Sequence, residues 1–240
     1  MNGSKLKLIA VITMLIDHVA YGIVWKIPSI GSGSPLYGSM RCIGRMAFPI
    51  YIFLLIEGFK YTRNKLKYAA RLLAFCFISE VPFDLAFNSS IFELGYQNVF
   101  FTLLIGFVTI CGMDAVWTKL YKCQKECIIP TVILDILIVG AGCALAFYLK
   151  TDYKFAGVLA IVVMYLFREI RVLQIMLGIV VLMCLSSLTE VFAMMIIPCV
   201  LAYNGERGVG LKYFFYAFYP VHLAIIYVVA VLLGVNFWFI

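Results

Sequence analysis

An aspartate and a histidine stand side by side inside the first apolar stretch of the chain. Asp17 and His18 interrupt residues 6–25, which otherwise run apolar from Leu8. Ionisable side chains in a stretch long enough to cross a bilayer are costly, and they usually face a bundle interior or a wet cavity. An imidazole in such a place is suited to take a proton, so His18 is a candidate general base. Adjacent helical residues point about 100° apart, so we expect Asp17 to pair with an arginine rather than to orient His18.

Three later apolar stretches carry polar pairs whose members are four residues apart. That spacing places both side chains on one face of a helix. The pairs are Arg41 with Arg45, Glu80 with Asp84, and Asn98 with Thr102. Together with Asp17 they carry two positive and three negative formal charges, and this near-cancellation suits a mutually paired, partly buried cluster. We therefore predict that these residues converge around His18.

A structural role is the alternative for each of these residues. The arginines and carboxylates could be ion pairs that lock helices together, or interfacial side chains that extend to water. His222 follows Pro220, which removes one hydrogen bond from the helix backbone. Its imidazole either binds a neighbouring carbonyl or takes part in catalysis.

The composition indicates an integral membrane protein with a single domain over residues 1–240. Apolar residues make up 65% of the chain, charged residues 13%, and the mean hydropathy is +1.05. Soluble domains are about half apolar and a quarter charged. The net charge of +7 is explained by basic cytoplasmic loops, so no nucleic-acid partner is expected. Cys123 and Cys127 have no histidine nearby, so no metal site is expected.

The apolar runs predict an all-α bundle of about nine transmembrane helices, with eight to ten possible. The predicted spans are 6–25, 40–59, 68–87, 98–117, 128–149, 155–167, 172–185, 191–203 and 213–235. Residues 186–190 are expected to form a tight turn. Most Lys and Arg residues fall in the loops of one side, which places the N-terminus inside and the C-terminus outside. Asp17, His18 and the three pairs then lie in the outer half of the bilayer.

Basic residues gather at the start of the chain and in the loop at 60–71. The positive-inside bias alone accounts for them. The functional alternative is docking of a phosphate-rich cytosolic donor. The candidate phosphate contacts are Lys5, Lys7, Lys60, Arg63, Lys65, Lys67 and Arg71.

Five motifs, in order along most of the chain, resemble the TraX family. They are KLKLIAVITMLIDH at 5–18, RCIGRMAFPIYIFLLIEGF at 41–59, ISEVPFDLAF at 78–87, NVFFTLLIG at 98–106 and YFFYAFYPVHL at 213–223. The family takes its name from the conjugation protein that N-acetylates the F-pilin subunit. It is similar to the acyltransferase-3 group, whose first span has a basic residue, ten residues and a histidine. Lys7 and His18 stand at that spacing.

The resemblance implies a multi-pass acyltransferase of the bacterial cytoplasmic membrane, with acetyl-CoA or another acyl-CoA as donor. It implies that His18 is the base and that Asp17, Glu80 and Asp84 assist it. Substrate binding or oxyanion stabilisation would fall to the remaining site residues, Arg41, Arg45, Asn98, Thr102 and His222. The acceptor is an amine or hydroxyl of a protein, lipid or glycan. Two other classes stay open: a proton-coupled transporter or flippase that uses the same charges, and a scaffold in which the cluster is structural.

Overall fold

A computed structural model of the chain describes residues 1–121, 128–209 and 212–235, and every regular element in that part is helical. This confirms the predicted all-α class. Cys123 and Cys127 lie outside the described residues. The chain forms two compact units. The first contains Met1–Leu54, Phe77–Glu93 and Ser187–Ile240, and the second contains Leu55–Cys76 and Leu94–Ser186.

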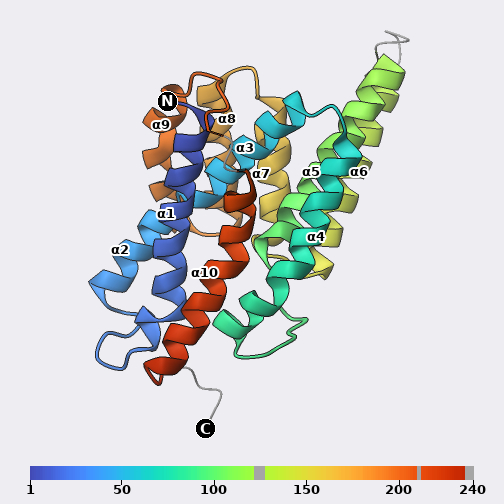
Figure 1. Cartoon of the computed structure of the whole chain (residues 1–240). Helices are drawn as coiled ribbons and strands as arrows, with labels where there is room; N and C mark the ends of the chain where they lie inside the picture. The colour runs from blue at the N-terminus through green and yellow to red at the C-terminus, as the bar shows by residue number, and fades with distance from the viewer. Residues whose placement is uncertain (122–127, 210–211, 236–240) are drawn as a thin grey trace. The chain divides into compact units, whose positions relative to one another are not determined.

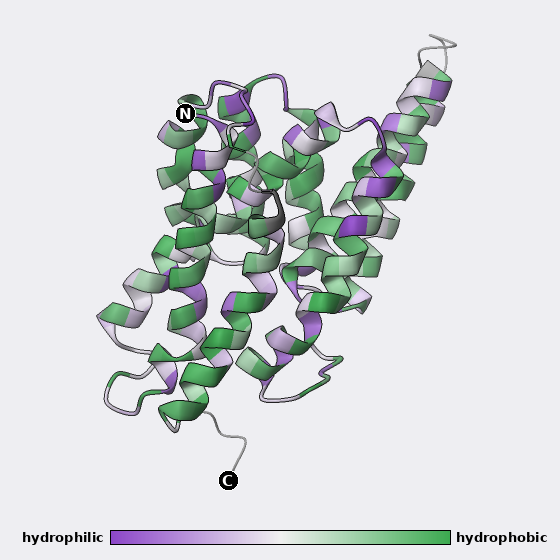
Figure 2. Cartoon of the chain, in the orientation of Figure 1, coloured by the Kyte–Doolittle hydropathy of each residue, from purple (hydrophilic) through white to green (hydrophobic). Residues whose placement is uncertain are grey.

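Five helices in the described residues are long and apolar enough to cross a membrane. They are Gly3–Lys26, Pro35–Tyr61, Val99–Leu120, Ile128–Tyr148 and Phe214–Leu232. Hydrophobic residues line most of each helix, and hydrophilic residues gather mainly in loops and at helix ends (Figure 2). The protein is therefore a membrane protein, as predicted. The count of nine spans and the orientation of the N-terminus stay predictions.

The first unit is organised around its first helix. Its elements are α1 (Gly3–Gly22), η1 (Val24–Lys26), α2 (Pro35–Gly44), the π-helix η2 (Asp84–Asn88), the 3₁₀-helix η4 (Leu188–Ile196), α9 (Ile197–Leu201) and α10 (Lys212–Leu232). Helix α1 packs against α2 and α10, and η4 packs against α2 (Figure 1). Segments from both ends of the chain thus surround the helix that carries Asp17 and His18.

The predicted span at 40–59 lies within Pro35–Tyr61, which consists of two helical segments with a short turn between them. Ser34 caps α2 by accepting a hydrogen bond from the Tyr37 amide, and α2 ends at Gly44. Helix α3 (Ala47–Tyr61) then starts anew. Pro49 has no N–H to donate to the carbonyl of Arg45, so the backbone ladder cannot run through this point. Arg45 therefore sits at the C-cap of α2 instead of within a continuous helix.

The segment before α10 also differs from its prediction. A tight turn was expected at 186–190 and a helix at 191–203, whereas η4 begins at Leu188 and α9 covers only Ile197–Leu201. Pro198 cannot donate to the Met194 carbonyl, which explains why one α-helix does not cover the whole segment. A 3₁₀-helix of nine residues is long for its type. It carries Glu190 into the interior.

The second unit consists of consecutive helices packed on their neighbours. These are α5 (Val99–Val116), the π-helix η3 (Trp117–Tyr121), α6 (Ile128–Tyr148), α7 (Lys154–Leu166) and α8 (Arg171–Leu185). Helix α7 packs against α5, α6 and α8. Helices α3 and α4 (Lys65–Phe83) contribute residues to both units.

Candidate functional site

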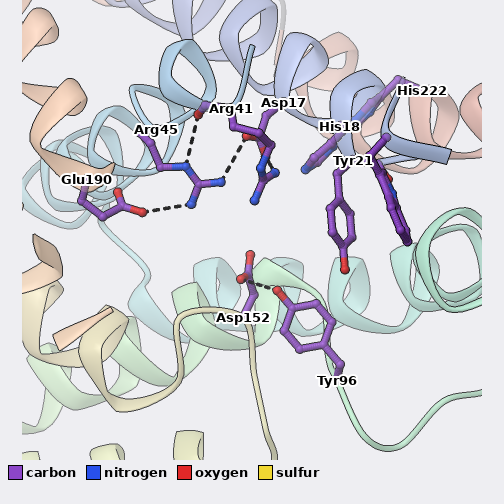
Figure 3. A network of polar contacts seen from close by, with 10 residues as sticks. Asp17, His18, Tyr21, Arg41, Arg45, Tyr96, Asp152, Glu190 and His222 are labelled. Carbon is purple, nitrogen blue, oxygen red and sulfur yellow. Dashed lines mark hydrogen bonds and ion pairs between the residues drawn. The ribbon is translucent and has the colours of Figure 1, made fainter. Parts of the chain in front are cut away.

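A chain of ion pairs links three elements of the first unit. Asp17 of α1 accepts hydrogen bonds from Arg41 Nη1 at 2.6 Å and from Arg45 Nη2 at 3.1 Å. Arg45 also donates through Nη1 to Glu190 Oε1 of η4 at 3.0 Å, and through Nε to the Arg41 carbonyl at 3.3 Å. In Figure 3 the Arg45 guanidinium lies between the two carboxylates. The expected pairing of Asp17 with an arginine is thus present twice.

The four charges cancel where water is scarce. The side chain of Glu190 is fully buried, those of Asp17 and Arg45 are 14% and 13% exposed, and that of Arg41 is 28% exposed. A buried charge is tolerated only when it is paired and hydrogen-bonded. Two carboxylates against two guanidinium groups meet this condition, so the network holds α1, α2 and η4 together.

Gly44 lets α2 approach the Asp17 side chain. A Cβ added at Gly44 would overlap the carboxylate of Asp17, whereas a Cβ added at Gly38, on the same helix, would meet nothing. Close contact at this one position therefore requires glycine.

We expect Gly44→Ala to displace Asp17 and destabilise the protein by about 1–3 kcal/mol, as overpacking does. Gly38→Ala should be neutral or stabilise the exposed helix by up to about 1 kcal/mol, because alanine favours helices. Thermal unfolding of both variants in detergent measures the difference. Equal melting temperatures for the two variants would show that the Asp17 carboxylate does not fix the spacing of α1 and α2.

His18 is paired with the only other histidine of the chain, which lies 204 residues away. Nδ1 of His18 is 2.7 Å from Nε2 of His222. The two ring planes are parallel to within 4°. The ring centroids are 5.0 Å apart, and this equals the N···N distance plus the distance from each nitrogen to the centre of its own ring. The rings therefore meet end to end in nearly one plane, as a ring-to-ring hydrogen bond requires. His222 is almost fully buried, whereas His18 is half-buried.

The outer nitrogens of the pair differ in their partners. Nδ1 of His222 lies 2.7 Å from the carbonyl oxygen of Phe218. Within the described residues, Nε2 of His18 has no hydrogen-bond partner. Both roles weighed for His222 on the sequence are thus compatible with the structure, since it binds a neighbouring carbonyl and contacts His18. The pair leaves one imidazole nitrogen available to a substrate.

The Arg41 guanidinium also has N–H groups that donate to no protein group in the described residues. Its guanidinium carbon lies 5.2 Å from the centre of the Tyr21 ring. In the described part of the chain, Nη1 is its only nitrogen that donates to another side chain or to the backbone. Arg45, by contrast, donates through Nε, Nη1 and Nη2. Of the two arginines, Arg41 is the more exposed and the better placed to bind an added oxygen atom.

Comparison with known proteins covers nearly the whole chain. The family model described as TraX protein matches residues 2–230. The chain belongs to the TraX family. Over 249 aligned positions it is 28% identical to the probable fimbrial assembly protein FimC, serogroup H1, of Dichelobacter nodosus, and the alignment covers 94% of each chain. No solved structure matches it. The resemblance seen in the sequence motifs is thus confirmed.

The remaining polar pairs of this TraX-family chain have local partners. Asp84, fully buried at the start of η2, accepts hydrogen bonds from Asn88 Nδ2 at 2.9 Å and from the Glu93 amide at 2.8 Å. These bonds tie down the segment that follows η2. Glu80 is buried near the end of α4, in the first unit. The structure shows no hydrogen bond from either arginine to Asp84, within the residues it describes.

Asn98 and Thr102 have their hydrogen bonds inside the second unit. Asn98 caps α5 by accepting from the Phe100 amide at 3.0 Å, and it donates to the Cys76 carbonyl at 2.8 Å. Thr102 is hydrogen-bonded to the Thr151 hydroxyl at 3.0 Å and to the Asp152 carbonyl. The Tyr96–Asp152 hydrogen bond drawn in Figure 3 also belongs to this unit. Both predicted site residues thus bind protein groups of the second unit.

The basic residues proposed for phosphate contacts differ in the contacts that they already make within the protein. Lys65 is paired with Asp114 at 2.6 Å and lies over the Phe59 ring at 4.0 Å. Three other basic side chains lie over aromatic rings. Lys7 lies over Phe215, Lys60 over Tyr61 and Arg71 over Tyr68. Lys5, Lys60, Arg63 and Lys67 are exposed. Exposed cations that carry no ion pair are the better candidates for a soluble anionic ligand.

Sequence reasoning missed Glu190. It lies in a segment taken for a turn, 145 residues from its partner Arg45. No periodic pattern connects two positions so far apart. Charge balance does not indicate it either, because Asp17, Glu80 and Asp84 already balance the two arginines in the charge count.

Proposed function

We propose that this TraX-family protein is a membrane-embedded acyltransferase. It moves an acyl group, acetyl in the first instance, from cytosolic acyl-CoA to an amine or hydroxyl at the extracytoplasmic side of the cytoplasmic membrane. The observation that carries the proposal is the half-buried His18 imidazole, held at Nδ1 by His222 and without a partner at Nε2 in the described residues. Acyl transfer needs a base so placed, because the acceptor must lose a proton as it attacks.

The proposed reaction step uses Nε2 of His18 as the proton acceptor. The acceptor amine or hydroxyl attacks the thioester carbonyl, while His18 Nε2 takes its proton. The C–S bond then breaks, and the CoA thiolate recovers the proton from His18. The products are the acylated acceptor and free CoA, and the enzyme returns to its starting state.

Arg41 is the proposed donor to the oxyanion that forms during this step. Donors aimed at a developing negative charge in a water-poor site are among the largest contributions to catalysis. Arg45 and Asn98, the other two candidates, already bind protein groups through the contacts described above. In this proposal Arg45 and Asp17 hold Arg41 in place through the ion pairs.

The acceptor is proposed from the relative's name. That protein is described as a probable fimbrial assembly protein. A subunit of a surface fibre is therefore the first acceptor to test, before lipids and glycans.

The donor is proposed to bind through exposed cations of residues 60–71, which were predicted to be a loop but run from the end of α3 into the first turns of α4. Lys67→Glu is expected to raise the KM for acetyl-CoA about tenfold with kcat within twofold, since a charge-assisted contact to phosphate contributes about 1.5–3 kcal/mol. Lys119→Glu is the matched control, because Lys119 is another exposed lysine of the same unit that lies outside residues 60–71. Steady-state kinetics with acetyl-CoA measure KM and kcat for both variants. An equal rise in KM for the two would indicate long-range electrostatic attraction of the donor instead of a direct contact with Lys67.

Purified protein with radiolabelled acetyl-CoA tests the proposal itself. We expect release of CoA thiol, and label on an amine or hydroxyl acceptor. A folded protein that turns over no acyl-CoA, with or without a fibre subunit, and that drives proton-coupled uptake into proteoliposomes would replace the proposal with a transporter.

A further inference from the structure

The two ring nitrogens of His222 have partners of different kinds, and this decides where its proton lies. Nδ1 is 2.7 Å from the carbonyl oxygen of Phe218, on the preceding turn of α10. A carbonyl oxygen can only accept a hydrogen bond, so Nδ1 of His222 carries a hydrogen. In the neutral imidazole only one nitrogen is protonated, and Nε2 of His222 is then an acceptor.

The position of the hydrogen on His18 can be assigned in the same way. Its Nδ1 lies 2.7 Å from that acceptor nitrogen, so it must supply the hydrogen of the bond. Nε2 of neutral His18 is left with its lone pair. The end-to-end, nearly coplanar arrangement of the rings supports this, since the N–H bond and the lone pair of an imidazole both lie in the ring plane.

We infer that His222 is a positioning residue that fixes the tautomer of His18, so that Nε2 of His18 is the proton acceptor. The direction of donation runs from His18 Nδ1–H to His222 Nε2, and from His222 Nδ1–H to the Phe218 carbonyl. The use of this tautomer in catalysis rests on the proposed acyltransferase function, whereas the tautomer itself does not.

The arrangement also stabilises the charge that forms during turnover. When Nε2 of His18 takes the acceptor's proton, the cation keeps its Nδ1–H bond to His222. That hydrogen can shift to Nε2 of His222, which then carries the charge with Nδ1–H still on the Phe218 carbonyl. Transfer of the Nε2 proton to the CoA thiolate, with return of the shared hydrogen, restores both neutral rings. A neutral imidazole here takes the orienting place that a carboxylate holds in a Ser-His-Asp triad.

Packing around the pair limits ring rotation. The His18 ring has edge contacts to Phe87 at 5.2 Å and to Tyr219 at 5.9 Å between centroids. The Phe218 ring lies 4.7 Å from the His222 ring and nearly parallel to it. Both imidazoles are therefore held while a proton is exchanged at the one open nitrogen.

Nitrogen NMR can read the tautomers directly, because the chain has only two histidines. The full chain, labelled with ¹⁵N-imidazole histidine and carrying a purification tag free of histidine, would be studied in lipid nanodiscs at neutral pH. We expect Nδ1 protonated and Nε2 unprotonated on both rings. A hydrogen on Nε2 of His18 in the folded wild type would overturn the inference.

Two substitutions at His222 separate hydrogen bonding from packing. His222→Gln keeps an oxygen acceptor near the position of Nε2 and should preserve the Nδ1–H form of His18. His222→Leu removes the acceptor and should move the hydrogen of His18 to Nε2, in part or fully. Val221→Ala, at an exposed neighbouring position of α10, controls for substitution in this helix. An unchanged His18 tautomer in folded His222→Leu would overturn the inference.

Kinetics then test the positioning role. With acetyl-CoA as donor, His222→Leu should lower kcat about 10²-fold, in the range of general-base effects, with KM within twofold. His222→Gln should recover to within about tenfold of wild type. Full activity in His222→Leu would refute the positioning role. A wild type that shows the expected tautomers and transfers no acyl group would refute the proposed function while the tautomer assignment stands.

Discussion

Replacing His18 with alanine is expected to lower the kcat for acyl transfer by about 10²- to 10⁴-fold, the range of general-base contributions. The acceptor would then have to lose its proton to water in a half-buried site where water is scarce. Binding of acyl-CoA should change little, because the imidazole acts on the acceptor and not on the donor phosphates. The measurement is release of CoA thiol and labelled acceptor by purified protein, wild type beside variant.

Two further variants make that result interpretable. His18→Gln keeps a polar side chain that could bind His222, but it offers no base, so it should be as slow as His18→Ala. Ile12→Ala shortens an exposed side chain on the same helix and should retain wild-type rates. If folded His18→Ala transfers acyl groups at the normal rate, another residue is the base. If His18→Gln is active while His18→Ala is not, the imidazole serves packing or hydrogen bonding instead.

Local rules predicted the elements and the nearest pairings of the site. Asp17 and Arg41 are 24 residues apart on neighbouring apolar segments, and opposite charges in such segments have few other partners. Asn98 was expected at the start of a helix, and it caps α5. Charge balance and helix periodicity are sufficient for inferences of this kind, because both act within one element or between sequential neighbours.

Pairings between distant segments could not be derived in the same way. His18 and His222 were each candidates, but nothing in the sequence indicates that a ring near the start of the chain meets one 204 residues later. The charge count placed Asp84 among the carboxylates that would balance the two arginines. Asp84 instead binds Asn88 and the Glu93 amide, and Glu190 binds Arg45. A formal charge can be balanced by any carboxylate, so only the packing of η4 on α2 selects Glu190.

Asp17→Asn is expected to destabilise the protein by about 3–5 kcal/mol, the usual result of removing one partner of a buried ion pair. Asp17 is the only acidic partner of Arg41 in the described residues, and it also binds Arg45. Its neutralisation leaves one net positive charge in a site that is at most 28% exposed. In a chain of this length each kcal/mol corresponds to about 2–4 °C in Tm, so thermal unfolding in detergent should shift by about 6–20 °C.

The double variant Asp17→Asn with Arg41→Gln tests whether charge is the cause. It leaves Arg45 and Glu190 as a balanced pair, so it should be more stable than Asp17→Asn alone, with a coupling energy of about 0.5–3 kcal/mol. Glu169→Gln is the control, because its carboxylate is 78% exposed and its pair with Arg168 spans 3.6 Å. Surface pairs of that kind contribute about 0–1 kcal/mol. A double variant no more stable than Asp17→Asn would show that the shape of the Asp17 hydrogen bonds, and not the net charge of the cluster, holds α1 to α2.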